Sequence, residues 1–361
     1  MWVLIGSLTG TLGIFDLGIR SAVIRFVARE HARGDHTAAS RLASAARVMF
    51  LAAGGLVLIV AAGMTFGLGH WFTVPAGQLG ESRLVLLITA ASLCVSIQGG
   101  LYFGVLSAMQ RLDLVAVADI VFELMRAALV VLVLSAGGGL LGLALIGLAL
   151  GVLRFWFVQS RAASVYPELG IRLALPAAAD VRMILSVSAY STLIYTSLTV
   201  VAQAKTLIIG ATLPMTMVAF YAIGTTLPGY ANALNRPIAQ TVHPRASRCD
   251  AIGDIDGLRR LVLGTGRYSA LILGPVALTF LLRGESFIGI WMGREFREMS
   301  GQVLSVLALA MLFTAPRHVV QAAFVGSGRH KALAPWYILE AATVLALSLI
   351  LIPRFGIVGA A

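Results

Sequence analysis

Charged residues and cysteines are both scarce in this chain of 361 residues. Asp, Glu, Lys and Arg make up 12% of the sequence, whereas they make up about 25% of soluble domains. The two cysteines are Cys94, inside an apolar run, and Cys249, in an expected cytosolic loop, so the sequence predicts no disulfide framework. The motifs of hydrolases, kinases and dinucleotide-binding enzymes are absent, as are paired Cys and His motifs. These absences argue against an enzyme, a cofactor and a metal site.

Apolar residues dominate instead, at 59% of the sequence, above the roughly 45–50% of soluble domains. They gather in runs of about 20 residues, the length of a helix that crosses a bilayer. We therefore predict an all-α integral membrane protein. Its ten expected spans are residues 2–19, 48–68, 84–106, 114–135, 139–158, 183–203, 216–234, 264–282, 302–321 and 333–352, and an eleventh is expected to begin at GIVGAA, after Pro353.

The basic residues predict which way the chain faces. The formal net charge is +11, and most Lys and Arg fall in one set of alternate connections, with Arg154 counted among them and Arg126 left inside a span. Because short cytoplasmic loops carry the excess of Lys and Arg, this set is expected to face the cytosol. The charges are spread over many loops rather than gathered in one basic domain, so nucleic acid is not an expected partner.

The sequence also contains an internal repeat. Five residues of the loop RFVAREHARGDHTAASRL recur in PRASRCDAIGDIDGLRRL at one constant spacing: the pairs are Arg29 and Arg248, Gly34 and Gly253, Asp35 and Asp254, Arg41 and Arg260, and Leu42 and Leu261. At nearly the same spacing, Arg111 matches Arg329, and the GLLG that begins at Gly139 matches the GIVG that begins at Gly356. Long-period similarity of this kind in a membrane protein indicates two structural repeats.

The repeat predicts the domain organisation. When the two halves are aligned by this repeat, the 183–203 span has no counterpart in the first half of the sequence. The counterpart of the 139–158 span would lie beyond Ala361. We therefore expect a two-lobe helical bundle with a pseudo-twofold repeat of six plus six helices, of which this sequence lacks the first helix and most of the last. The expected domains are an N-lobe at 1–160, a cytoplasmic linker at 161–182 and a C-lobe at 183–361.

Charged residues inside the predicted spans are the candidates for chemistry. A charge at the bilayer centre costs about 2.5–3.5 kcal/mol on insertion scales, so it usually faces a cavity or the bundle interior. Asp119, Glu123 and Arg126 are spaced i, i+4 and i+7 on one helical stripe, and the repeat puts Glu340 opposite Glu123. Either Glu123 and Arg126 neutralise each other and pack the bundle, or the acidic residues Asp119, Glu123 and Glu340 couple transport to H⁺ or Na⁺.

Further polar groups lie near the ends of the spans. Asp16 and Arg20 are expected to form a salt bridge at the membrane interface, and Asn235 and Arg236 occupy the comparable place in the repeat. Arginine stays charged and binds phosphate in bidentate fashion, so a cavity lined by these arginines would favour an anion. The last polar residues near the ends of spans are Arg317, His318, Gln321, Gln203 and Lys205. Their simplest interpretation is that the side chains snorkel to the lipid headgroups and form no site.

Three segments carry a family resemblance over essentially the whole chain. FDLGIRSAVIRFVAREHARGD, SAMQRLDLVAVADIV and GSGRHKALA resemble the polysaccharide-transporter (Wzx-type) oligosaccharide flippases of the multidrug/oligosaccharidyl-lipid/polysaccharide (MOP) exporter superfamily. The resemblance implies a MATE-like fold, with two six-helix lobes around a central cavity that opens alternately to the two sides of the membrane. It further implies a multi-pass protein of the inner cell membrane that functions in the biosynthesis of cell-surface polysaccharide, such as O-antigen or exopolysaccharide.

The implied cargo is an undecaprenyl-pyrophosphate-linked oligosaccharide, and the other implied partners are membrane lipids, a polysaccharide polymerase and glycosyltransferases. The family's cavity is often cationic, and Arg20, Arg126, Arg236 and Arg317 are the positions here that match this property. Three alternatives stay open at this point. One is a cation-coupled antiporter of drugs or organic cations with the same fold. Another is a polytopic glycosyltransferase or polymerase, although such enzymes usually carry a larger outer loop. The third is a non-transporting scaffold in a polysaccharide assembly complex, although a scaffold has no need for buried Arg and Glu.

Overall fold

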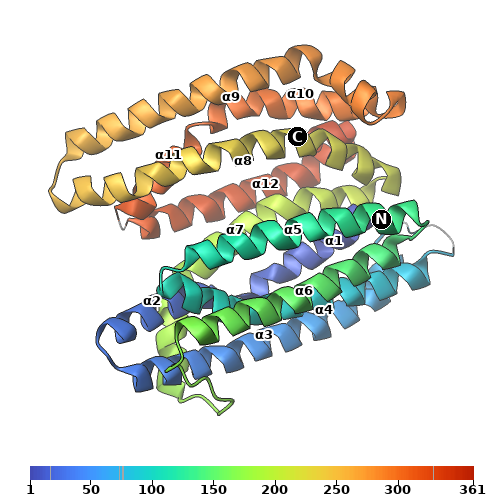
Figure 1. The fold of residues 1–361 in the computed structure, drawn as a ribbon. Coiled ribbons are helices and arrows are strands. Elements are labelled where there is room, and N and C mark those ends of the chain that lie inside the picture. Colours follow the sequence, from blue (N-terminus) through green and yellow to red (C-terminus); the bar gives the residue numbers. More distant parts are fainter. Residues whose placement is uncertain (17, 73, 75–76, 328) are drawn as a thin grey trace. The chain divides into compact units, whose positions relative to one another are not determined.

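The computed structural model describes residues 1–16, 18–72, 74, 77–327 and 329–361, and the side chains of all of these except 236, 239, 240, 243, 244, 330 and 331. Every regular element in this part of the chain is helical (Figure 1), which confirms the predicted all-α class. The elements are α1 (Trp2–Leu12), η1 (Gly13–Asp16), α2 (Ile19–Ala32), α3 (His36–Trp71), α4 (Leu79–Ala108), α5 (Leu112–Ser135), α6 (Leu140–Val165), α7 (Ala178–Thr212), α8 (Met215–Ala251), α9 (Ile255–Trp291), η2 (Arg294–Phe296), α10 (Arg297–Thr314), α11 (Arg317–Gly326), η3 (His330–Leu333), α12 (Ala334–Phe355) and η4 (Gly356–Ala360).

The chain forms two compact units, Met1–Thr199 and Val200–Ala361, and the division falls inside α7. The first part of α7 packs within the first unit, where Asp180 pairs with Arg41 of α3 at 3.5 Å. Gly18 lies so close to α7 that a Cβ on it would meet the carbonyl oxygen of Ser188 at 3.2 Å. These contacts place the start of α7 with the first unit, although the sequence suggested that a second lobe begins at residue 183. The lobe boundaries themselves stay a prediction.

Eight helical segments of the described chain are long and apolar enough to cross a membrane, with Trp2–Ala32 counted as one. Each of the ten expected spans overlaps a long helix, and the two outside the eight lie in α5 and α8. At about 36 Å, α5 is long enough to span a bilayer, but any 18-residue stretch of it contains Asp119, Glu123 and Arg126. The stripe of charged residues that was predicted from the sequence is therefore what distinguishes α5 from the eight apolar segments.

Two expected spans end differently in the structure. The 302–321 span is interrupted, because α10 ends at Thr314 and α11 begins at Arg317, with Pro316 as its N-cap. Proline has no amide hydrogen and clashes with the preceding turn, which explains the break. The 333–352 span continues through Pro353 to Phe355, and the segment expected to open an eleventh span forms the short 3-10 helix η4.

The first unit is held together by close packing of small side chains. The buried face of α3 carries Ala39, Ala43, Ala46, Ala53 and Ala61 at helical spacing, facing α4 and α2. Small residues let helix backbones approach closely, which is the main source of attraction between helices where lipid replaces water. Larger side chains, such as Phe50 and Leu101, fill the remaining space in this core.

The repeated loop has the same backbone structure in both copies. In the first, the amide of Gly34 donates to the carbonyl of His31, and the amide of Asp35 donates to that of Glu30. In the second, Gly253 donates to Asp250 and Asp254 donates to Cys249. This pattern is the Schellman motif, which satisfies the last carbonyls of a helix with a left-handed residue after its end.

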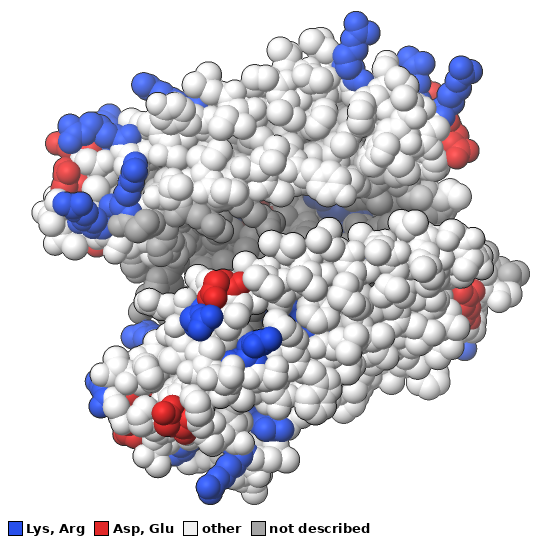
Figure 2. Space-filling view, in the orientation of Figure 1, with Lys and Arg blue, Asp and Glu red and all other residues white. Residues whose placement is uncertain are grey.

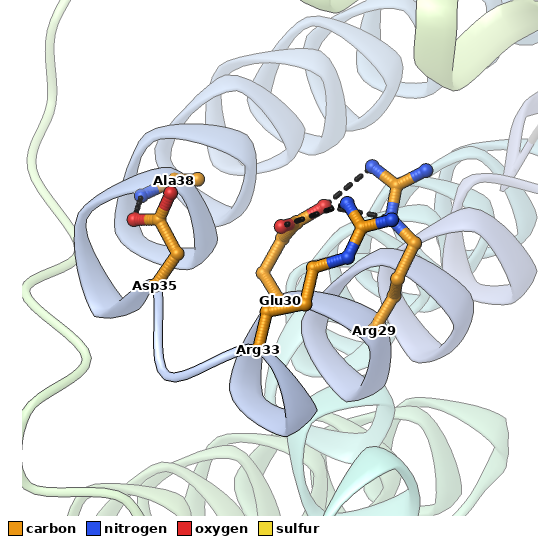
Figure 3. Close-up of polar contacts among 5 residues, drawn as sticks. All are labelled: Arg29, Glu30, Arg33, Asp35 and Ala38. Carbon is orange, nitrogen blue, oxygen red and sulfur yellow. Dashed lines mark hydrogen bonds and ion pairs between the residues drawn. The ribbon is translucent and has the colours of Figure 1, made fainter.

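Each loop then starts the next helix in the same way. The Asp35 carboxylate accepts a hydrogen bond of 2.8 Å from the amide of Ala38 (Figure 3), and the Asp254 carboxylate accepts one of 2.7 Å from the amide of Gly257. These bonds cap α3 and α9, and the Ala38 amide holds the pKa of Asp35 below its usual value. The packing repeats as well, since α2, α3 and α4 contact one another as α8, α9 and α10 do. The structure thus confirms the internal repeat within each unit.

Gly34→Ala and Gly253→Ala should each lower the midpoint of thermal unfolding of the purified protein by a few degrees. The two glycines have φ of +72° and +70°, where a residue with a Cβ pays about 1–2 kcal/mol, and 1 kcal/mol corresponds to roughly 2–4 °C in a domain of this size. Gly63→Ala in α3 and Gly264→Ala in α9 are matched controls, because a Cβ there would also meet nothing within 4 Å but the backbone is helical. Equal effects at all four positions would contradict the role of the left-handed conformation.

Candidate functional site

A cavity of about 490 Å³ lies inside the first unit, between α2, α4, α5 and α6. Part of its lining is small residues of α4 and α6, among them Ser92, Gly99, Gly147 and Gly151. The aromatic and charged residues that line it are Trp2, Phe103, Phe122, Phe155, Arg20, Asp119, Glu123, Arg126 and Arg154.

The predicted stripe of α5 faces this cavity, since Asp119, Glu123 and Arg126 all line it. Glu123 pairs with Arg126 on the same helix at 3.7 Å, which is the mutual neutralisation that the spacing allows. Asp119 has a different partner, because its carboxylate accepts a hydrogen bond from Arg154 of α6. Both carboxylates of the cavity are therefore engaged by arginines.

Arg20 enters the same cavity from α2, but it does not form the expected salt bridge with Asp16. Gly18 separates the 3-10 helix η1 from α2 with a left-handed φ of +61°, so the helical i, i+4 geometry that the prediction assumed is broken. The guanidinium of Arg20 lies 4.7 Å from the centroid of the Phe103 ring, a cation–π contact. Its Nε is buried and has no hydrogen-bond partner among the described residues.

Gly100 of α4 makes room for this arginine. A Cβ on Gly100 would meet the ring of Phe50 at 3.3 Å and the Nε of Arg20 at 3.5 Å. The guanidinium thus packs against an aromatic face beside a close helix backbone, and the Asp16 carboxylate acts on its charge without forming an ion pair. Counting the described charged groups of the cavity, three arginines face two carboxylates, so its formal charge is positive.

The second unit holds another charged cluster. Arg317, the first residue of α11, binds Glu340 of α12 with both ends of its guanidinium, at 2.6 Å from Nη1 to Oε1 and 2.5 Å from Nη2 to Oε2. The same guanidinium lies 5.7 Å from the centroid of the Tyr337 ring. Lys205 of α7 lies within electrostatic reach of Glu340 and has no ion pair among the described side chains.

The remaining candidate, Arg236, lies in α8, and its side chain is outside the described part of the structure. Its neighbour Asn235 is fully buried, and its side-chain amide donates a 2.7 Å hydrogen bond to the carbonyl of Ala315. That carbonyl lies at the break before Pro316, where no helical amide can satisfy it. Asn235 therefore stabilises the α10–α11 junction.

Two cationic residues near the candidate sites were not predicted as site residues from the sequence. Arg154 was counted with the cytosolic connections, yet it lies within α6 and lines the cavity. The signal that would have found it is its place in the apolar run GLALGVLRFWFV. Lys205 was interpreted as a snorkelling residue. It lies within electrostatic reach of Glu340, which is far from it in the chain, so no sequence spacing reveals their proximity.

The charged groups elsewhere follow the pattern of a membrane protein. Figure 2 shows broad faces without charge along the helices and clusters of Lys and Arg at the helix ends. Arg29 and Arg33, at the end of α2, pair with the buried Glu30 at 2.5 Å and 3.6 Å (Figure 3). These pairs lie next to the loop between α2 and α3, and none of their three residues lines the cavity.

Comparison with solved structures defines the class of the fold. A multidrug resistance MATE family transporter of the MOP superfamily, in its inward-facing conformation, matches with a TM-score of 0.85 at 14% identity, over 99% of this chain and 84% of the other. An outward-facing structure of such a transporter matches with a TM-score of 0.69 at 15% identity, over 99% and 80%. A MOP superfamily transporter from Pyrococcus furiosus, described as having reverse polarity of its binding pocket, matches with a TM-score of 0.69 at 14% identity, over 99% and 81%. The chain has the MATE-like fold of the MOP transporters, as predicted.

A family match makes the assignment more specific. Residues 15–301 match the family of polysaccharide biosynthesis proteins, and the chain belongs to this family. No curated protein matches the sequence. Family and fold together identify a multi-pass membrane protein with the architecture of a transporter, and they confirm the resemblance stated from the sequence.

The cavity should be open to water-soluble reagents. In a background with Cys94→Ala and Cys249→Ala, a cysteine at Ser96, which is exposed and lines the cavity, should react with a small maleimide about tenfold faster than one at Ser82, because reactivity follows exposure of the thiolate. Ser82 is on the same helix and 1% exposed. Equal rates at the two positions would contradict an open cavity.

Proposed function

We propose that this protein moves an undecaprenyl-pyrophosphate-linked oligosaccharide across the cell membrane by alternating access, for the assembly of a cell-surface polysaccharide. The observation that carries the proposal is the positive cavity of the first unit. Both of its carboxylates are engaged by arginines, and Arg20 forms an ion pair with neither of them. A pyrophosphate supplies the missing negative charge.

The chemistry of arginine supports this choice of cargo. A guanidinium keeps its charge at any physiological pH and presents a fork of donors that fits phosphate oxygens. A fixed positive charge in an apolar wall is costly unless an anion or water compensates it, so such a cavity selects anionic ligands. The aromatic rings beside the arginines, Trp2, Phe103 and Phe122, offer flat apolar faces against which a prenyl chain or a sugar ring can pack.

The family supports the saccharide part of the cargo, because its members are described as polysaccharide biosynthesis proteins. Polymers at the cell surface require that sugar units made on the inner leaflet reach the outer one. Polar sugars cannot cross the hydrocarbon layer unaided. We expect a polymerase and glycosyltransferases as partners in the inner membrane, and H⁺ or Na⁺ as the coupling ion, acting at Asp119, Glu123 or Glu340.

The main competing function is the export of organic cations or drugs, since two of the structures with this fold are described as multidrug resistance transporters. A cavity for a cation needs an unpaired carboxylate or an excess of negative charge. Here Asp119, Glu123 and Glu340 are each paired with an arginine, and the Asp16 carboxylate lies within electrostatic reach of Arg20. Each of these acidic groups thus has a cation nearby, which favours the anionic cargo.

Replacing Arg20 or Arg126 with Gln should abolish export while the protein stays in the membrane. In a strain that lacks the gene, lipid-linked oligosaccharide should accumulate on the cytosolic leaflet, and the unaltered gene but neither variant should relieve this accumulation. Arg111→Gln is the control, because Arg111 is exposed and pairs with Asp113 at 2.9 Å outside the cavity. Accumulation that never appears, together with altered drug sensitivity, would favour the antiporter, and incorporation of sugar by the purified protein would favour an enzyme.

A further inference from the structure

The chain between α6 and α7 is fastened to the start of α3 by its backbone. Residues 166–177 form no helix or strand and run beside α3 (Figure 1). The amide of Gly170 donates a 3.0 Å hydrogen bond to the hydroxyl of Ser40, and the amide of Arg172 donates one of 2.9 Å to the hydroxyl of Ser44. Because the two serines are one turn apart on α3, they fix two successive points of the connection on this helix.

Both ends of the connection are anchored as well. At its start, Tyr166 is 1% exposed, and its hydroxyl lies 2.7 Å from Nδ1 of His36. At its end, Asp180 of α7 pairs with Arg41 of α3 at 3.5 Å. All of these residues belong to the first unit. The connection therefore has a defined position along α3.

Two helices place this connection close to the membrane surface. The predicted spans of α3 and α7 begin at residues 48 and 183. At 1.5 Å per residue, Ser44 lies about 6 Å outside the first span, and Ala178, the first residue of α7, lies about 8 Å outside the second. The headgroup layer of one leaflet is about 5–8 Å thick. Residues 172–177 thus lie at the level of the headgroups, on the side that the basic loops predict to be cytosolic.

Two leucines at this level expose most of their surface. Leu173 is 69% exposed and Leu175 is 96% exposed, whereas Ile171, just before them, packs against the core of the first unit. Water would gain nothing from these two side chains. The acyl chains of the lipids are close to this level, and apolar side chains of interfacial segments reach about 5–10 Å into the boundary between headgroups and acyl chains. Lipid is therefore the apolar surface that is available to the leucines.

The charges around the leucines suit the same surroundings. The two stretches of chain at this level, residues 40–47 and 166–182, contain more arginines than acidic residues: Arg41, Arg47, Arg172 and Arg182 against Glu168 and Asp180. Arg41, Arg172 and Arg182 are exposed. Anionic lipids give the cytoplasmic leaflet a negative surface potential, which attracts such a positive stretch.

From this arrangement we propose that residues 172–177 are a membrane-contact segment, in which Leu173 and Leu175 enter the cytoplasmic leaflet and the arginines lie among the lipid phosphates. Ser40 and Ser44 hold the segment at the height that this contact needs. The connection between α6 and α7 is then attached to the lipid surface instead of being surrounded by water. The contact depends only on the place of the chain in a membrane, so it is independent of the proposed cargo.

The test is the depth of residue 175 in vesicles of phosphatidylethanolamine and phosphatidylglycerol that contain the full-length protein. In a background with Cys94→Ala and Cys249→Ala, the variant Leu175→Cys is labelled with the fluorophore NBD, and lipids brominated on their acyl chains are used as quenchers. Two further single-cysteine variants on α3 calibrate the depth. Leu51→Cys is exposed and lies just inside the predicted span, whereas Thr37→Cys is exposed and lies about 16 Å outside it.

Brominated lipid should quench the label at Leu175→Cys nearly as strongly as at Leu51→Cys, and at least about threefold more strongly than at Thr37→Cys, because interfacial side chains reach the acyl chains. Leu173→Cys repeats the measurement, so a folding defect in one variant leaves the other as an independent test.

Quenching at both leucine positions no stronger than at Thr37→Cys would overturn the proposal, and iodide in the water would then identify what surrounds the label. Quenching by iodide as strong as at Thr37→Cys would show a connection in open water. Protection from iodide and from brominated lipid together would show that a protein surface covers the leucines. Each of these results contradicts contact with lipid.

Discussion

An arginine in an apolar helix bundle must find an anion, an aromatic face or water, and the arginines of the two charged clusters illustrate this requirement. Arg154 and Arg317 hold carboxylates from neighbouring helices, whereas Arg20 lies over the ring of Phe103. The first solution also ties helices together, whereas the second leaves the guanidinium without an ion pair to a carboxylate.

The helices that carry these groups were predictable because the bilayer dictates their length and composition. A chain that crosses a membrane must satisfy its backbone hydrogen bonds internally, so a long apolar run is expected to form an α-helix. All ten predicted spans overlap long helices. The repeat was equally visible, because Gly34 and Gly253 occupy left-handed positions that only glycine adopts without strain. The stripe of Asp119, Glu123 and Arg126 followed from helical periodicity alone.

The partners of those groups were not predictable, since they depend on how one helix packs on another. Asp119 pairs with Arg154 across two helices, although Arg126 is its neighbour along the stripe. Asp16 and Arg20 had the spacing of a helical salt bridge, but the turn at Gly18 separates them. The break at Pro316 was hidden within an apolar run, and the fully buried Asn235 that supports it gives no signal in a single sequence. Local periodicity thus identifies which residues are exceptional, and packing decides what they contact.

The Schellman loop that occurs twice shows how a duplicated protein can diverge. Its shape depends on amide-to-carbonyl bonds and one glycine, so the other side chains of the loop are free to change. Glu30 and His31 in one copy correspond to Cys249 and Asp250 in the other. The first copy uses His31 to contact the Tyr166 ring, at 4.9 Å between centroids, and the second uses Asp250 to bind Arg329. The two copies of the loop thus share a backbone and differ in the contacts that their side chains make.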